Sequence, residues 1–494
     1  MKRKLILGLI VCLAFLAISV LPGVVFAETW TQVPPPWDAN NEAAFATMVH
    51  EGNLYVGTAN PTNGGELWRT TDGTIWTPAA AGGFGVLSNT DIDVGSVFNG
   101  SLYAGTWTAA NTGQIYRSAD GLAWSLVTVP FDANNHWVDP LVAYGGFIYA
   151  GTGNNVTGGE IWRSADGVSW NQVNDDGFNN PANISAMVTA AFEGNIYAST
   201  HNPTHGGEIW RSSNGVSWSQ VATAGFGNPS NVRIWHMAAL DGYLYAGTQN
   251  PSQGLEIWRS PDGSSGSWSP VETAGIDDVN NLFATSLSAV GGELYVGTKN
   301  LVAGPKVYRS TNGTTWTHIN PAGFGAGDTR THGWFKVLNG SIYVGVDNPS
   351  IGELWRLSLD NTSAGTKVNV PFGGGISLVF DNVSSGGSST FTETTEAPSL
   401  PTGFNLIGTY YDISTDVSFT GPIEVTLPYD ESEVQGNEAD LKLFHWNGTS
   451  WEDVTVSVDT TNNKITGETT SLSPFAIAMS SPPTGVNTYW LLVV

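Results

Sequence analysis

The sequence predicts an all-β chain: a seven-bladed β-propeller over residues 28–358, closed by an N-terminal strand, followed by an antiparallel β-sandwich over residues 366–479. Three observations lead to this prediction. A short strand pattern recurs about every 48 residues, which is typical of propeller blades. Glycine (60 residues) and tryptophan (20) are abundant while only 12% of residues are charged, a composition typical of tight turns and flat aromatic packing. After Leu359 the repeat stops, but short alternating apolar and polar runs continue.

The repeat is read from seven segments of the type LYVGT, IYAGT or IYAST. Their tyrosines are Tyr55, Tyr103, Tyr149, Tyr197, Tyr245, Tyr295 and Tyr343. Each unit then reaches an arginine, namely Arg69, Arg117, Arg163, Arg211, Arg259, Arg309 or Arg356. In the fifth unit we expect strands over 232–240, 243–248, 256–260 and 268–271. A solenoid of this period would need helical 3.6-residue patterning, which the repeats lack.

A tryptophan closes each unit except the last. It stands at Trp76, Trp124, Trp170, Trp218, Trp268 and Trp316, six positions for seven arginines. The missing partner is at the other end of the domain, because Trp30-Thr31-Gln32-Val33 matches Trp218-Ser219-Gln220-Val221. We therefore expect a strand from the N-terminus to complete the seventh unit and to remove a free sheet edge.

The turn Ser164-Ala165-Asp166-Gly167, which leads to Trp170, resembles the Asp-box (BNR) repeat of sialidases, sortilin-type receptors, some xyloglucanases and photosystem assembly factors. Its spacing to the tryptophan is one residue shorter than usual. The residues at the acidic position are Asp72, Asp120, Asp166, Asn214, Asp262 and Asn312. Asp and Ser accept hydrogen bonds from the backbone of their own turn, and Gly adopts positive φ. We therefore expect these residues to be structural.

Residues that differ from one unit to the next are the candidates for a functional site. They lie in and after the loops that lead into the first, innermost strand of each unit. The candidates are Asp91, Asp93, His136, Trp137, Asp139, Arg233, Trp235, His236, Arg330, His332 and Trp334. This mixture of imidazole, guanidinium, carboxylate and indole suits a polar, aromatic-lined pocket for a sugar or a charged small ligand. The alternative is that they are ordinary channel-lining groups that water satisfies. A ligand pocket requires that they converge on one cavity.

Several enzyme classes were weighed against a binding role. A sialidase needs three arginines for the substrate carboxylate, and only Arg233 and Arg330 stand outside the repeat, so this class is disfavoured. A glycosidase needs two carboxyl groups, which Asp91 or Asp93 facing Asp139 would supply. A polysaccharide lyase would use His136, His236 or His332 as a base. We prefer a binding or interaction module for carbohydrate or protein ligands, with a carbohydrate-active enzyme as the alternative.

The two ends of the chain and its net charge predict the location of the protein and the partners that it binds. Residues 1–27 combine Lys2-Arg3-Lys4 with a long apolar run and end in Ala27, as an export signal does, so we expect a secreted or cell-surface protein. Residues 480–494 are either a final strand or the start of a membrane anchor that would tether the chain. A net charge of −25 disfavours nucleic acid as a partner. We expect a monomer that holds no cofactor. We also expect no metal, because the loop asparagines such as Asn60-Pro61 are turn formers and not metal ligands.

Residues 359–365 read as a linker to the second domain. The run LKLFHWNGTSWEDVT followed by SLSPFAIA is similar to C-terminal modules of bacterial and archaeal secreted surface proteins. That resemblance implies a structural or tethering role for the β-sandwich, in which no catalytic grouping stands out.

Overall fold

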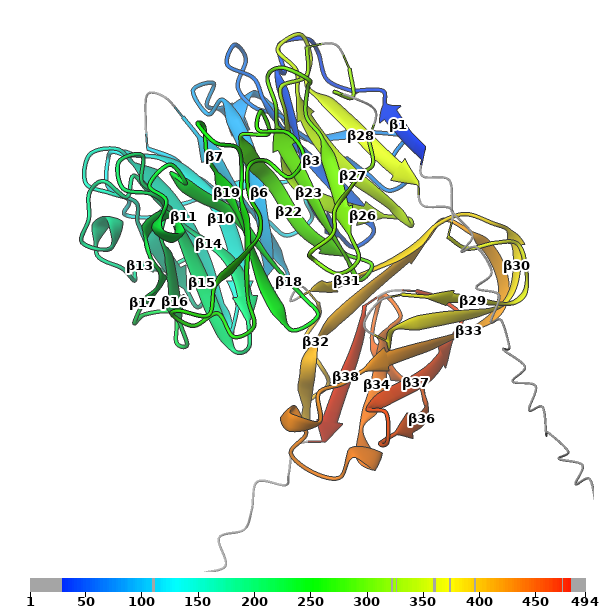
Figure 1. The fold of residues 1–494 in the computed structure, drawn as a ribbon. Helices are drawn as coiled ribbons and strands as arrows, with labels where there is room; N and C mark the ends of the chain where they lie inside the picture. Colours follow the sequence, from blue (N-terminus) through cyan, green and yellow to red (C-terminus); the bar gives the residue numbers. More distant parts are fainter. Residues whose placement is uncertain are drawn as a thin grey trace, which may run out of the picture.

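The computed structural model describes residues 29–480, apart from 109–111, 321–322, 326, 359–360, 373–374, 395–396 and 473. The predicted export signal and residues 481–494 of the predicted tail lie outside the described residues. Within the described part of the chain, no helix has the length and apolar character needed to cross a membrane. The chain is all-β, as the sequence predicts (Figure 1).

Strands β1 to β28 pair into seven successive sets of four among the described residues. The first strands are β2 (Ala43–His50), β6 (Asp91–Phe98), β10 (Asn135–Tyr144), β14 (Ser185–Phe192), β18 (Arg233–Leu240), β22 (Phe283–Val290) and β26 (Arg330–Leu338). The second strands are β3 (Asn53–Ala59), β7 (Ser101–Trp107), β11 (Phe147–Asn154), β15 (Asn195–His201), β19 (Tyr243–Gln249), β23 (Glu293–Lys299) and β27 (Ser341–Asp347). The third strands are β4 (Leu67–Thr70), β8 (Ile115–Ser118), β12 (Ile161–Ser164), β16 (Ile209–Ser212), β20 (Ile257–Ser260), β24 (Val307–Ser310) and β28 (Glu353–Ser358).

The outer strands complete each set. They are β5 (Thr77–Ala80), β9 (Ser125–Val127), β13 (Trp170–Gln172), β17 (Ser219–Ala222), β21 (Ser269–Glu272), β25 (Thr317–His318) and, for the seventh set, β1 (Thr29–Val33). Short 3₁₀ helices follow three outer strands: η1 (Gly82–Gly85), η2 (Asp176–Phe178) and η3 (Ala224–Gly227). The strand positions in the fifth set agree with the expected ones to within one residue.

The first strands form a closed ring, because each contacts the first strands of both neighbouring sets, and β26 lies beside β2. At this closure β2 and β26 are parallel, with Ala46 opposite Gly333. The outer closure is the predicted one: β1 pairs antiparallel with β28, Thr31 opposite Arg356. The Trp30 indole donates a hydrogen bond to the Ile319 carbonyl at 2.8 Å and so ties β1 to the sixth set.

Neighbouring sets are joined by a tyrosine that touches the turn of the next set. A Cβ added at Gly167 would lie 1.8 Å from the Tyr103 hydroxyl oxygen, and Gly167 has φ +72°. The same contact joins Tyr55 to Gly121 and, across the ring closure, Tyr343 to Gly73. Glycine is therefore required here for two reasons, the left-handed backbone and the close approach of the tyrosine.

The turns themselves behave as the sequence predicts. The Asp166 carboxylate accepts hydrogen bonds from the backbone N–H groups of Val168 and Ser169 at 2.8 and 2.7 Å. These backbone hydrogen bonds lower the pKa of Asp166 below its usual range. Asp72, Asp120, Asn214, Asp262 and Asn312 accept equivalent backbone bonds in their own turns. None of these six residues lines the cavity described below.

A buried polar network, which the sequence did not predict, recurs with variations among the sets. In the third set the Glu160 carboxylate accepts hydrogen bonds from the Asn135 amide and from the Trp162 indole, both at 2.6 Å. The Asn135 carbonyl oxygen in turn accepts from the Thr152 hydroxyl and the Asn154 amide. These side-chain hydrogen bonds hold the loops at this end of the strands.

The remaining strands form two five-stranded antiparallel sheets with β-sandwich character. One contains β29 (Gly365–Pro371), β30 (Ser377–Ser385), β33 (Ser418–Pro428), β37 (Lys464–Thr469) and β36 (Thr455–Asp459). The other contains β31 (Ser389–Thr394), β32 (Phe404–Thr415), β38 (Phe475–Ser480), β34 (Lys442–Trp446) and β35 (Trp451–Asp453). Helices η5 (Glu431–Glu433) and η6 (Glu438–Asp440) follow β33. The core between the sheets is built from residues such as Phe380, Ile423 and Phe475, all fully buried.

The two regions meet where β31 and β32 approach the turns after β22 and β26 (Figure 1). The Gly291 backbone N–H donates to the Phe391 carbonyl at 2.6 Å, and the Gly340 N–H donates to the Ser414 hydroxyl at 2.8 Å. Each glycine belongs to the tight turn between a first and a second strand. This junction is therefore at the opposite end of the first strands from the entry loops that carry the site candidates.

Candidate functional site

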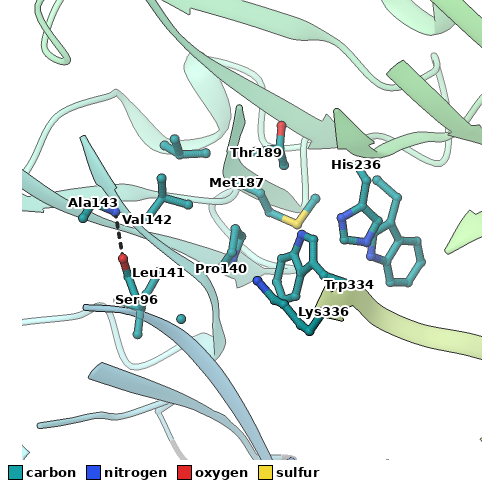
Figure 2. A pocket seen from close by; sticks show the side chains of 13 residues that line it. Ser96, Pro140, Leu141, Val142, Ala143, Met187, Thr189, His236, Trp334 and Lys336 are labelled. Carbon is teal, nitrogen blue, oxygen red and sulfur yellow. Dashed lines mark hydrogen bonds between the residues drawn. The ribbon is translucent and has the colours of Figure 1, made fainter. Parts of the chain in front are cut away.

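A cavity of about 150 Å³ lies inside the ring of first strands (Figure 2). Its lining comes from β6, β10, β14, β18 and β26, and consists of Gly95, Ser96, Pro140, Leu141, Val142, Ala143, Met187, Val188, Thr189, Trp235, His236, Trp334 and Lys336. Figure 2 shows Met187, His236, Trp334 and Lys336 gathered on one side and Ser96, Leu141 and Ala143 on the other. The repeat is thus broken asymmetrically: bulky polar and aromatic residues face small ones.

Three predicted site residues, Trp235, His236 and Trp334, line this cavity. The His236 and Trp334 rings meet edge to face, with centroids 5.3 Å apart. The Trp235 ring lies 6.4 Å from the His236 ring and nearly parallel to it. The two indoles and the imidazole therefore form an aromatic wall around the cavity.

His236 contributes its ring to the cavity wall. The residue is only 6% exposed, and its Nε2 is buried without a hydrogen-bond partner among the described residues. Burial, followed by the charges of Arg233 and His332, lowers the pKa of His236 to about 3, although a hydrogen bond with the Thr285 backbone acts to raise it. The ring is therefore neutral at ordinary pH.

Arg233 supports this wall from the edge of the ring. Its guanidinium lies over the Trp235 ring at 3.8 Å from the centroid. Its Nη2 donates to the sulfur of Met187, another lining residue, at 3.1 Å. Arg233 thus stacks on one lining residue and bonds to a second, which fixes the position of the indole.

The first strands surround a central channel, and we call the end of this channel at which the first strands begin and the second strands end the channel rim. The rim includes Asp91, Arg233, Lys299, Arg330 and Asp347. Here the Asp347 carboxylate accepts a hydrogen bond from His332 Nδ1 at 2.7 Å and another from Arg330 Nε. Burial opposes ionisation of Asp347 most strongly, but the charges and hydrogen bonds of His332 and Arg330 together hold its pKa below the usual range. Two predicted residues, Arg330 and His332, are thus bound to a carboxylate and do not line the cavity.

Asp91 lies on the same rim with the opposite electrostatic behaviour. Burial raises the pKa of Asp91 to about 7, the Asp347 charge adds to the increase, and the Thr90 hydroxyl and Arg330 oppose it. Two neighbouring carboxyl groups on the rim therefore have pKa values displaced in opposite directions.

The other predicted residues are in the wall of the ring and not in the cavity lining. Trp137 packs flat against the Gly153 backbone, where a Cβ would lie 2.0 Å from the indole, and pairs with Trp107. His136 lies in β10 with a buried Nδ1 that has no hydrogen-bond partner among the described residues. Asp93 lies in β6 opposite Gly105. Asp139 belongs to β10, and its side chain lies outside the described part of the structure.

The expectation that the candidates converge on one cavity is therefore met only by Trp235, His236 and Trp334. The sequence analysis missed Lys336, Thr189 and Ser96 in the cavity and Asp347 on the rim. Asp347 had a signal: it ends a second strand, at the position occupied by Ala59, Trp107, His201 and Lys299 elsewhere. Because this position pairs with the start of the next first strand, as Lys299 does with Arg330, comparing it as well would have found the residue.

The comparisons with known proteins concern the fold. No family model and no curated protein matches this chain. Among solved structures, the WD40 β-propeller domain of Doa1 is 13% identical with a TM-score of 0.45, covering 66% of this chain and 96% of that one. Saccharomyces cerevisiae Sqt1 is 13% identical with a TM-score of 0.40, covering 76% and 94%.

An ancestral GH74 enzyme is 15% identical with a TM-score of 0.44, and the match covers 64% of this chain but only 48% of the enzyme. At these identities and TM-scores the similarity carries no argument about activity. The strand pairing alone describes an all-β fold of propeller type with an additional β-sandwich.

Proposed function

We propose that this chain is an exported cell-surface or extracellular binding protein, a seven-bladed Asp-box propeller that holds a carbohydrate in its central cavity and is carried on the β-sandwich. The observation that carries the proposal is the cavity wall of Trp235, Trp334 and His236. Aromatic faces pack against the apolar faces of sugar rings.

The size of the cavity limits what enters it. A cavity of about 150 Å³ accommodates one six-membered ring, as an engineered apolar cavity of that volume accommodates benzene. A whole oligosaccharide or a protein segment of several side chains would not fit inside. The ligand is therefore one ring, either a free sugar or the terminal residue of a glycan.

The test is binding to a panel of glycans by isothermal titration calorimetry, with the whole exported chain. Trp334→Ala removes one wall of the cavity, and we expect it to weaken sugar binding about tenfold or more. Trp446→Ala, in β34 of the sandwich, is the matched control and leaves sugar binding unchanged. Unaltered affinity in Trp334→Ala, or no glycan binding at all, contradicts the proposal.

A carbohydrate-active enzyme is the alternative, and one observation favours it. Asp91, with a pKa of about 7, and Asp347, with a lowered pKa, have the opposite displacements that an acid and its partner carboxylate require. Both Asp347 oxygens, however, already accept hydrogen bonds. His236 is a poor lyase base, because its pKa of about 3 lies far from working pH. Glycan cleavage that Asp91→Asn abolishes would establish the enzyme and displace the binding proposal.

A further inference from the structure

The charges around the cavity narrow the class of ligand, an inference that rests on the proposed carbohydrate-binding function. Of the described residues that line the cavity, Lys336 alone carries a charge. Its Nζ lies 5.6 Å from the centroid of the Trp334 ring, and Figure 2 shows it beside that indole. A cation therefore already occupies the neighbourhood of the aromatic wall, which disfavours a cationic ligand stacked on the same ring.

The positions of the basic residues in the ring also disfavour a cationic ligand and favour an anionic one. Five basic residues between β2 and β28 stand outside the repeated arginine position: Arg233, Lys299, Lys306, Arg330 and Lys336. Lys306 binds Asp277 and Asp278 on the periphery. The other four lie in first strands or at the end of the second strand that borders them. In a chain of net charge −25, the non-repeated cations are thus concentrated around the cavity and its rim.

Burial is the main cause of the lowered pKa values near the rim, and the neighbouring cations add to it. Burial and then Arg233 lower the pKa of His201 to about 3, and burial, with Arg330 and Arg233, lowers the pKa of His332 against the charge of Asp347. Burial and Arg330 lower the pKa of Lys299. The carboxylates of this region include Asp347, which binds Arg330 and His332, and Asp91 and Asp93 in β6. The positive side of the channel is therefore formed by β18, β23 and β26.

We propose that the central cavity takes a single carboxylated sugar ring, a terminal uronate, with its carboxylate toward Lys336. The indoles of Trp235 and Trp334 contact the faces of the ring. The volume of about 150 Å³ limits the ligand to one such ring, and the rest of an acidic glycan extends toward the rim, where Arg233 and Lys299 lie.

The experiment uses three probes that share one ring and differ at a single carbon: methyl glucuronide, its methyl ester and methyl glucoside. Affinities for the full exported chain are measured by calorimetry at low and high ionic strength. We expect the glucuronide to bind about tenfold more tightly than the other two, because only it carries a negative charge that pairs with the Lys336 ammonium. Salt should weaken glucuronide binding and leave glucoside binding unchanged.

Variants then assign the preference to Lys336. Lys336→Gln should reduce glucuronide binding to the level of the glucoside, whereas Lys306→Gln, which alters a peripheral cation, keeps the full preference. Equal affinity of the three probes, or a preference that persists in Lys336→Gln, overturns the uronate inference while the sugar-binding function stands. Failure of every probe and of the glycan panel overturns both. The salt dependence of the unaltered protein gives the same decision if Lys336→Gln does not fold.

Discussion

Gly167 follows a segment whose charged residues resemble a catalytic cluster in the sequence. The segment from Glu160 to Asp166 contains a Glu, an Arg and an Asp, yet each side chain has a structural partner. Glu160 accepts from Asn135 and Trp162, Asp166 binds its own turn, and the Arg163 guanidinium donates to the Asn214 carbonyl of the next set at 2.8 Å. The cluster is therefore a joint between neighbouring sets.

Gly167→Ala measures the strength of that joint. At φ +72° an alanine has a left-handed backbone conformation, which costs about 1–2 kcal/mol. Its Cβ also overlaps the Tyr103 hydroxyl. The control is Gly194→Ala, which has nearly the same φ of +68° but no atom within 4 Å of the Cβ. Urea unfolding should show Gly167→Ala to be destabilised by about 1–3 kcal/mol more than Gly194→Ala, the range for overpacking. Equal losses would mean that the tyrosine contact contributes nothing.

Asp91 gives a prediction about pH. Its folded pKa of about 7 exceeds the ordinary value of 3.8, so the folded chain binds a proton that the unfolded chain releases between these values. The associated stability is fully present below pH 3.8 and is lost as the pH rises through about 7. Asp91→Asn removes this dependence, so the variant should gain about 2–4 kcal/mol over the unaltered protein between pH 4 and pH 8. Thermal unfolding at several pH values tests this, and a pH-independent difference between the two proteins would refute it.

At the scale of elements, the sixth set shows that the repeat tolerates a change when its surroundings change too. The buried network there has Lys306 and Tyr308 at the positions of Glu160 and Trp162. Lys306 Nζ lies 3.1 Å from Asp277 and 3.4 Å from Asp278, and the Tyr308 hydroxyl donates to Asp277. The two extra carboxylates thus replace the single glutamate that all the other sets except the second have at this position.

Restoring the repeat residue in this set should therefore be harmful. Lys306→Glu places a third carboxylate beside Asp277 and Asp278, and we expect a loss of about 1–3 kcal/mol, the range for a poorly compensated buried charge. Lys306→Gln loses only the ion pairs and should cost less. The double variant Lys306→Glu with Asp277→Lys reverses the pair and should recover part of the loss in chemical denaturation. An unchanged or increased stability of Lys306→Glu would show that the carboxylates do not act on this position.

The strands of the fifth set could be predicted from the sequence to within a residue, but the cavity could not. Strand positions follow from the repeat, which averages over seven copies. The cavity depends on irregular register: β18 has a shift between Ile234 and His236, and β26 has one between His332 and Lys336. Such bulges re-aim side chains. Consecutive residues Trp235 and His236 can therefore both line the cavity, and Arg330 and Trp334 of one strand reach different surroundings.

In the whole molecule, the channel rim and the β-sandwich are at opposite ends of the first strands, and the cavity lies between them. The sandwich touches the turns at Gly291 and Gly340, whereas the rim begins at residues such as Arg233 and Arg330. Burial raises the pKa of Glu393 in β31, and the charge of Asp241, in the turn after β18, adds to the increase. The two carboxylates are therefore near each other. Among the described residues, the sandwich contacts the turns after β18, β22 and β26 and not the rim, so the proposed ligand has its access from the rim side.

Gly340 is the position at which this arrangement can be disturbed most selectively. A Cβ there would lie 2.2 Å from the Ser388 carbonyl oxygen of the sandwich, whereas a Cβ at Gly242, in the corresponding turn of the fifth set and with the same φ of +70°, meets no atom within 4 Å. Both Gly340→Ala and Gly242→Ala carry the same backbone strain. Only Gly340→Ala should separate the two regions, which small-angle X-ray scattering would detect as a larger radius of gyration and limited proteolysis as faster cleavage near residues 359–365. Sugar binding should persist in both variants, because neither turn contributes a residue to the cavity lining. If Gly340→Ala keeps the compact scattering profile of Gly242→Ala, the contact with Ser388 does not hold the sandwich in place.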